Sequence, residues 1–398
     1  ALATAMREGR LTREARNRLL VTMTDEVGRL VLRNNYLQGL AISLTERQGV
    51  ANGETLSRLM NVLEATGHLN RKVEYLPSAA AFAERYTAGK PLSRPEIGVL
   101  LSYAKITLSD AIVASTLPDD PWFARTLAGY FPERMQKVHA DDISTHPLRR
   151  EIIATVLANE VINRGGPGFI QAMSDATSAS AADVVRAAVL VREGFDLDKL
   201  WAGVDALDGK IKGALQLELY AAIETLYTEA TRILLKTGLE KGDINAAIQK
   251  IRTALRSLKP ALASATPTAI AEEIATRRAT FTEAGVPLTL AGDIAGLPLL
   301  VLTPEVLQVA EKTGATLLRA VEAYFAVSQT FRIPQLIRNG SRITTTDHYE
   351  ALALTHGLDQ IATARRQIVT AVLTAHGKER QPVEAWHAKD RLRINRVA

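Results

Sequence analysis

Two clusters of polar side chains interrupt otherwise apolar helical segments, and they are the best candidates for contacts with another molecule. The first cluster contains Arg33, Asn34, Asn35, Tyr36 and Gln38, and the second contains Asn159, Asn163 and Arg164. Asparagine is a poor residue in the middle of a helix because its side chain competes for backbone hydrogen bonds. A run of such residues therefore indicates contact with something polar. Packing against another part of the protein and bordering a ligand cleft would both explain it.

Residue types that bind metals do not come together in the sequence. None of the seven histidines has a partner histidine four residues away on a helix face, which gives a zinc site little support. The chain has no cysteine, and this excludes a disulfide scaffold, a thiolate zinc site, an iron–sulfur cluster and a cysteine nucleophile. We therefore predict no metal site.

Catalytic motifs are equally hard to find. The carboxylate pairs Asp119-Asp120 and Asp141-Asp142 lie beside proline or serine, where helix starts and turns explain them before acid–base catalysis does. The sequence contains no Walker loop, no Gly-x-Ser-x-Gly elbow and no His-Glu-x-x-His pair. We predict no catalytic residues in this chain.

The glycine cluster at residues 165–168 is the one segment that could hold a phosphate. A dinucleotide-binding turn lies between a strand and a helix and carries three glycines at set offsets. Gly165, Gly166 and Gly168 instead follow a helical run, and the third glycine is missing from its required place. We interpret the cluster as a helix-breaking turn and predict no cofactor-binding residues, while any further role of the turn stays open.

Composition and charge limit the class of protein. The chain of 398 residues is 47% hydrophobic and 23% charged, which is too apolar for a disordered chain. No apolar run approaches the roughly 20 residues that cross a bilayer, so we expect a soluble protein with no membrane partner. The net charge of +5 comes mainly from residues 1–18 and 378–398, and neither end has the contiguous basic face typical of nucleic-acid binding. The chain lacks an initiator methionine and a signal segment, which favours a cytoplasmic fragment of a longer protein.

Apolar residues recur at spacings of three and four along most of the chain, which is the period of a helix. Thr24-Asp25-Glu26 predicts the start of one helix, and residues 212–236 form the longest clean amphipathic stretch. Ser93-Arg94-Pro95-Glu96 combines a cap residue, a proline in the first turn and an acid at the third position, so it predicts a helix to about Ser115.

The C-terminal half continues the helical pattern. Thr303-Pro304-Glu305 repeats the start signal seen at Ser93 and predicts a helix over 303–328, and Thr346-Asp347 predicts the cap of a long final helix. No strand-like alternation flanked by turn residues and no repeat of fixed period occurs. The sequence therefore predicts an all-α fold, a multi-helix bundle-like body with no significant sheet.

Several longer stretches also agree with a known family. They are residues 31–38, 67–77, 92–106, 158–164, 179–187 and 201–208, with weaker agreement near 364–366. In this order, and over most of the chain, they resemble the C-terminal region of the large bacterial NAD-specific glutamate dehydrogenases. The stretch from Ser93 to Ile106 is too long for chance agreement.

The resemblance implies a parent enzyme of glutamate catabolism. Such enzymes oxidatively deaminate L-glutamate to 2-oxoglutarate and ammonia and reduce NAD, and their substrate lysines and nucleotide-binding turn lie upstream of the first residue here. The resemblance thus implies NAD as the cofactor of the parent, no cofactor in this chain, and the upstream catalytic domains of the same polypeptide as partners, in a homo-oligomer. Residues 1–48 are expected to leave the dehydrogenase core as a helical segment, and residues 49–398 to form a C-terminal helical domain that can subdivide near 165–180.

A set of candidate interdomain contacts follows from the polar clusters and the resemblance. The set comprises Arg33, Asn34, Asn35, Tyr36, Gln38, Arg94, Glu96, Asn159, Asn163 and Arg164. We expect the helix around Asn34 to dock against the catalytic domains with its amides facing them, and the whole chain to brace those domains or the oligomer without catalytic activity of its own. The alternative is a helical regulatory or interaction module that binds an effector or a partner protein.

Overall fold

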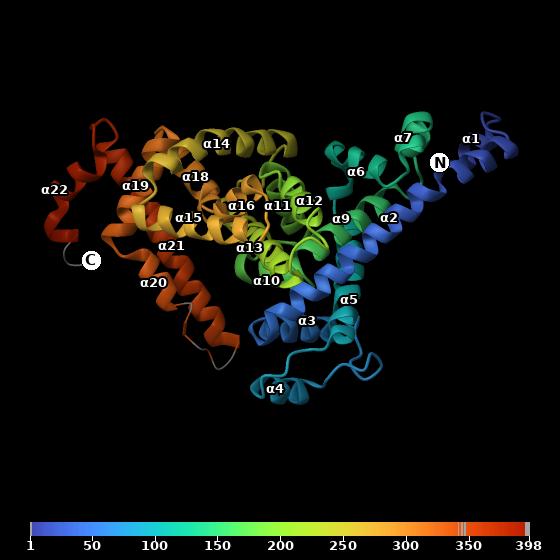
Figure 1. Cartoon of the computed structure of the whole chain (residues 1–398), viewed down its shortest axis with the longest axis horizontal. Helices are drawn as coiled ribbons and strands as arrows, with labels where there is room; N and C mark the ends of the chain where they lie inside the picture. The colour runs from blue at the N-terminus through green and yellow to red at the C-terminus, as the bar shows by residue number, and fades with distance from the viewer. Residues whose placement is uncertain (1, 341, 344, 346–347, 395–398) are drawn as a thin grey trace. The chain divides into compact units, whose positions relative to one another are not determined.

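The structure is a computed structural model that describes residues 2–340, 342–343, 345 and 348–394 (Figure 1). Every regular element within these residues is a helix, which confirms the predicted all-α fold. The cap predicted at Thr346-Asp347 lies outside the described residues. The chain divides by packing into two compact units, residues 1–186 (unit 1) and 187–398 (unit 2). The predicted border at residue 48 concerns a longer polypeptide and stays a prediction.

Unit 1 is built around one long helix and a central helix pair. Its elements are α1 (Leu2–Arg7), α2 (Arg13–Gln48), η1 (Gly49–Asn52), α3 (Gly53–Ala65), α4 (Ala79–Thr87), α5 (Arg94–Ala114), η2 (Leu117–Asp119), η3 (Pro121–Phe123), α6 (Ala124–Gly129), α7 (Glu133–Val138), α8 (Ala140–Ser144), α9 (Arg149–Gly165) and α10 (Phe169–Thr177). Leu100 and Ile112 of α5 are fully buried, as is Ile162 of α9, and these two helices form the centre of the core.

The start of α2 differs from the prediction. The helix begins at Arg13, where the Thr12 hydroxyl oxygen accepts a hydrogen bond from the Ala15 N–H at 3.2 Å. Thr24 therefore lies inside the helix, and its hydroxyl donates to the Leu20 carbonyl one turn earlier. The prediction at Thr24 was wrong because a threonine can bond its own helix as readily as it caps one.

The helix predicted at Ser93 is confirmed as α5. The Ser93 N–H donates to the Glu96 carboxylate at 2.6 Å, so the acid at the third position closes the start of the helix as expected. By length and mean hydropathy α5 could cross a membrane, and so could residues 288–313 if their bent helix pair is taken as one span. The prediction concerned uninterrupted apolar runs, and α5 is interrupted by Lys105 and Asp110. The buried core helix of a globular protein passes the same test, and Leu100 and Leu101 are buried in unit 1.

An ion pair joins the segment between α1 and α2 to α8. Arg10 donates to the Asp142 carboxylate at 2.6 and 3.1 Å, and the His139 ring lies 3.0 Å from the same carboxylate. The hydrogen bonds from Arg10 and His139 lower the pKa of Asp142 to about 2. Because the carboxylate ionises more easily in the folded chain, it stabilises the fold above its unfolded pKa of about 4 and loses this effect as the pH falls toward 2.

Replacing Asp142 by asparagine is therefore expected to have a pH-dependent effect. The variant should unfold at a lower temperature than the unchanged chain at pH 5, and the difference should shrink between pH 4 and pH 2 as the carboxylate is protonated. Melting curves followed by circular dichroism across this range test it. The exposed neighbour Asp141 provides the control, and equal curves for Asp141→Asn and Asp142→Asn would contradict the prediction.

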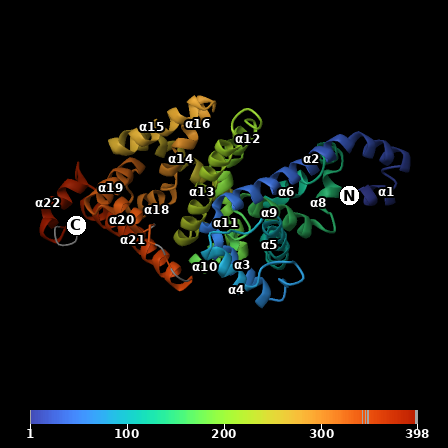
Figure 2. The same ribbon diagram turned by 60° about the horizontal axis from the view of Figure 1, so that its bottom comes forward.

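Unit 2 is a packed set of helices that begins within α11. Its elements are α11 (Ala181–Gly194), which starts in unit 1, α12 (Leu197–Asp205), α13 (Gly213–Thr237), α14 (Ile244–Ala265), α15 (Thr268–Glu283), α16 (Leu288–Ala295), α17 (Leu297–Leu300), α18 (Thr303–Thr313), α19 (Leu317–Thr330), α20 (Ile333–Gly340), α21 (His348–His376) and α22 (Pro382–Ile394). One of its hydrophobic clusters includes Leu258 of α14, Val309 of α18, Val327 of α19 and Val369 of α21. Figures 1 and 2 both show α18, α19 and α21 side by side.

One predicted helix is two helices in the structure. The segment over 303–328 breaks at Gly314, which has a φ of 68° and ends α18 before α19 begins. This left-handed conformation suits glycine because it has no Cβ. The break turns α19 back along α18 and α21, so that three helices share one core.

Candidate interdomain interface and buried polar cluster

The polar cluster on α2 lies on a part of the helix that is mostly exposed. The buried residues of α2 are Met23, Leu40, Ala41, Leu44 and Thr45, so the helix enters the core of unit 1 mainly through its last third. Asn34, Asn35 and Gln38 are exposed, and Tyr36 is half-buried with the Arg33 guanidinium 5.5 Å from its ring centre. The amide groups are thus presented outward from unit 1.

Apolar side chains continue this outward face toward the start of α2. Leu20, Val27 and Val31 are 39%, 44% and 52% exposed. With Asn34 and Gln38 they follow one another at steps of seven, four, three and four, which places all five along one stripe of the helix. We call these five residues the α2 stripe. A row of exposed aliphatic side chains that ends in amides is typical of a surface that another protein segment covers.

Arg94 and Glu96, both predicted as interdomain contacts, have partners inside unit 1. Arg94 donates to the Ser43 hydroxyl at 3.1 Å and to the Glu46 carboxylate at 2.6 Å, which fastens the start of α5 to the end of α2. Glu96 accepts from both terminal nitrogens of Arg85 at 2.7 and 3.0 Å. Burial opposes ionisation of Glu96, but the bonds from Arg85 and Ser93 outweigh it and lower its pKa.

The second predicted cluster lies on α9 and does not join the first. Asn159 donates to the Thr155 carbonyl in its own helix at 2.9 Å, and Asn163 is only 3% exposed. A Cβ at Gly166, just after α9, would lie 3.6 Å from the Thr45 hydroxyl, so α9 meets α2 near Thr45. Thr45 is ten residues from Asn35, or roughly 15 Å along the helix. The two clusters are therefore separate features.

The glycine-rich turn after α9 is explained by close packing. Gly166 has a φ of 82° and ends the helix, as predicted. A Cβ at Gly165 would overlap the ring of Phe169, and a Cβ at Gly168 would overlap the side chain of Thr55 on α3. The extra glycines thus allow α10 to pack closely against its neighbours.

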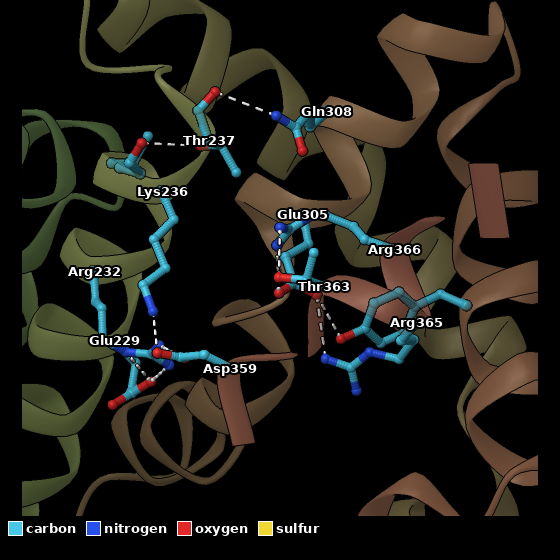
Figure 3. A network of polar contacts seen from close by, with 12 residues as sticks. Glu229, Arg232, Lys236, Thr237, Glu305, Gln308, Asp359, Thr363, Arg365 and Arg366 are labelled. Carbon is cyan, nitrogen blue, oxygen red and sulfur yellow. Dashed lines mark hydrogen bonds and ion pairs between the residues drawn. The ribbon is translucent and has the colours of Figure 1, made fainter. Parts of the chain in front are cut away.

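A buried polar cluster in unit 2 is the feature that sequence reasoning missed (Figure 3). Glu305 of α18 is 3% exposed, and its carboxylate accepts from the Tyr324 hydroxyl at 2.9 Å. The guanidinium groups of Arg365 and Arg366 on α21 each lie 3.2 Å from the same carboxylate. Arg365 also covers the Tyr324 ring at 4.1 Å from its centre. Burial, followed by the Glu305 charge, raises the pKa of Tyr324 well above its usual range.

Further polar contacts hold α13 to α18 and α21. Asp359 of α21 forms ion pairs with both Arg232 and Lys236 of α13, and Gln308 of α18 donates to the Thr237 carbonyl at 3.2 Å. Figure 3 shows these contacts beside the Glu305 cluster. Glu305 was interpreted only as part of a helix start. The sequence signal for a buried ion pair was the pair of adjacent arginines on an otherwise apolar helix. The sequence does not show with which acid they form ion pairs.

These contacts form a structural network, since each charged side chain named in it forms an ion pair with a side chain on another helix. Among the described residues, no group of three or more histidine, aspartate or glutamate side chains could hold a metal ion. The geometry assigns the Glu305 cluster to the joining of three helices. The residues of the α2 stripe, in contrast, are exposed.

Two family models match the chain. The glutamate dehydrogenase C-terminal model covers residues 89–398, and the model of the catalytic domain of bacterial NAD-glutamate dehydrogenase covers residues 1–45. The second match ends within α2, just after the α2 stripe. One helix therefore carries the end of a catalytic-domain pattern and also packs in unit 1.

Curated relatives agree with the family models. The chain is 32% identical to the NAD-specific glutamate dehydrogenase of Halomonas elongata over 94% of its length, and 33% identical to that of Pseudomonas aeruginosa over 92%. It is 28% identical to that of Mycobacterium tuberculosis over 98% of its length. The matched regions are 23%, 22% and 24% of the relatives, so the chain spans about a quarter of their length. The resemblance stated from the sequence is confirmed.

Proposed function

The chain belongs to the glutamate dehydrogenase C-terminal family, and from that premise we propose that it is a non-catalytic helical domain that braces the catalytic domains of a longer NAD-specific glutamate dehydrogenase. The parent enzyme oxidises L-glutamate to 2-oxoglutarate and ammonia and reduces NAD, which binds upstream of this chain. We further infer a cytoplasmic homo-oligomer from the resemblance.

The position of the α2 stripe is the observation that supports bracing most directly. Residues 1–45 match a catalytic-domain model, and the chain spans only about a quarter of the relatives' length. The side of α2 that carries Leu20, Val27 and Val31 is exposed in unit 1. The rest of the catalytic domain is therefore the part of the parent enzyme that we expect to pack against the α2 stripe. Burying a fully exposed aliphatic side chain contributes about 1.5–3 kcal/mol, and each of these three, which is about half exposed, would gain about half of that.

The length of α2 suits a mechanical role. A helix of 36 residues is roughly 54 Å long, and α2 runs without a break from Arg13 to Gln48. Its far end is held in unit 1 by buried Leu40 and Leu44 and by the ion pair between Arg94 and Glu46. A partner that binds the α2 stripe is therefore held in a fixed position relative to unit 1.

Association between this chain and the separately prepared upstream catalytic portion tests the proposal. Bracing predicts tight binding between the two, measured by calorimetry, and no turnover by this chain alone with glutamate and NAD. Replacing both Asn34 and Asn35 by alanine should weaken the association, because the catalytic side loses its polar partners. An absence of binding, or turnover by this chain alone, would refute the proposal.

A further inference from the structure

A groove in unit 2 lies between α18 and α21, next to the Glu305 cluster. It has a volume of about 470 Å³ and opens to solvent, and its polar lining consists of Gln308, Lys312, Arg366, Gln367, Thr370 and Thr374. Volumes of this order are typical of small-molecule sites. The proposed bracing function makes no use of this groove, since the α2 stripe belongs to unit 1.

The charges beneath the groove are not balanced. Glu305 is a single buried carboxylate, yet it faces two guanidinium groups, those of Arg365 and Arg366. One positive charge is therefore in excess in this cluster, and two of the residues that line the groove, Arg366 and Lys312, are cations. The Arg365 Nε has no hydrogen-bond acceptor among the described residues, which fits an excess of donors.

Neighbouring acids do not compensate this excess because they have cations of their own. Asp359 is paired with Arg232 and Lys236 on α13, and Glu311 is paired with Lys250 at 2.6 Å. The described residues that line the groove include two cations, Lys312 and Arg366, and no acid, so the lining itself is positively charged. An anion that enters it gains attraction without displacing an existing ion pair.

Side chains free to bind a ligand line the same groove. Lys312 and Gln367 are exposed, and within the part of the chain that the structure describes neither makes a hydrogen bond or an ion pair. Gln308 uses its amide nitrogen on the Thr237 carbonyl, which leaves its amide oxygen available. Ala371 supplies apolar surface between the polar groups. Cationic and amide donors in a groove whose exposed lining is mostly apolar suit an organic anion.

We propose that this groove binds a small molecule through an anionic oxygen group, a carboxylate or a phosphate. Lys312 and Arg366 pair with the anionic group, and the Gln367 amide donates a further hydrogen bond to it. Since α18 and α21 also carry Glu305 and its arginine partners, the bound anion lies against the polar contacts that join these helices.

Titration of the 398-residue chain with inorganic phosphate, and separately with succinate, tests the proposal. The ionic strength is held constant with sodium chloride, and binding is followed by calorimetry. At least one of the two anions is expected to bind saturably, with a Kd of about 1 mM or below. Saturation by phosphate alone indicates a phosphate ester as the natural ligand, saturation by succinate alone indicates a carboxylic acid, and saturation by both supports the shared chemistry.

Substitutions of residues that line the groove test whether the anion binds there. Lys312→Met and Gln367→Leu are each expected to weaken it about fivefold, whereas Lys210→Met, which removes an exposed lysine elsewhere in unit 2, should leave it unchanged. Within the described residues neither Lys312 nor Gln367 makes a polar contact, so the variants should keep the circular dichroism of the unchanged chain. Absence of saturation by both anions, or an equal loss in Lys210→Met, would overturn the proposal. Neither result depends on docking by α2.

Discussion

Replacing Glu305 by alanine is expected to lower the free energy of unfolding of unit 2 by about 3–5 kcal/mol. The substitution leaves Arg365 and Arg366 without their shared carboxylate, and Arg365 is itself buried. A charge that stays buried without a partner costs far more than the ion pair contributed. Chemical unfolding followed by tryptophan fluorescence measures the effect, since Trp201 and Trp386 both lie in unit 2.

Glu311 on the same helix provides a matched control. Its ion pair with Lys250 at 2.6 Å is about 40% exposed on both sides, so Glu311→Ala should change the free energy of unfolding by less than about 1 kcal/mol. A Glu305→Gln variant keeps an acceptor for the Tyr324 hydroxyl and should lose less stability than Glu305→Ala. Similar decreases in the free energy of unfolding for Glu305→Ala and Glu311→Ala would show that the buried cluster stabilises the fold no more than an exposed ion pair does.

Replacing Val31 by aspartate is expected to weaken the association of this chain with the upstream catalytic portion about 100-fold. Val31 lies in the middle of the α2 stripe, and docking would bury the new carboxylate without a partner. The stability of this chain alone should change by no more than about 0.5 kcal/mol, because Val31 is 52% exposed in unit 1. Calorimetric titration of the two parts, with a melting curve of each variant, gives both quantities.

The control for this experiment lies two residues away. Arg29 is exposed and lies on the opposite side of α2 from the stripe, and Arg29→Asp introduces the same side chain there. It is expected to leave the association nearly unchanged. A loss in Arg29→Asp equal to that in Val31→Asp would mean that overall helix charge, and not the stripe, controls the association.

Sequence reasoning was reliable where the physical cause is local. The capping pattern at Ser93 depends on atoms within one turn, and the structure contains the predicted bond from the Ser93 N–H to Glu96. The turn at Gly166 follows from the conformational freedom of glycine, and it also lies where expected. The Thr24 hydroxyl could either cap a new helix or bond to a carbonyl of the helix that contains it. In the structure it donates to the Leu20 carbonyl.

Sequence reasoning could not assign the polar residues to internal or external partners. Arg94 appeared available for another domain, but it meets Glu46, which is 48 residues away in the chain. Glu305 lies 60 and 61 residues from Arg365 and Arg366, and no short-range sequence pattern predicts that they form ion pairs. Asn34 and Asn163 are the same residue type in similar helical settings, yet Asn34 is exposed and Asn163 is buried.

The sequence by itself determined the helical class, most of the helix starts and the family, because periodicity, capping and motif order are properties of neighbouring residues. Only the tertiary structure decided which polar groups form hydrogen bonds or ion pairs within the chain and which stay exposed. It placed the charges of Glu305, Arg365 and Arg366 together and left the α2 stripe exposed. The reason is physical: the cost of burying a charge or an amide depends on which distant side chain meets it, and only packing brings those side chains together.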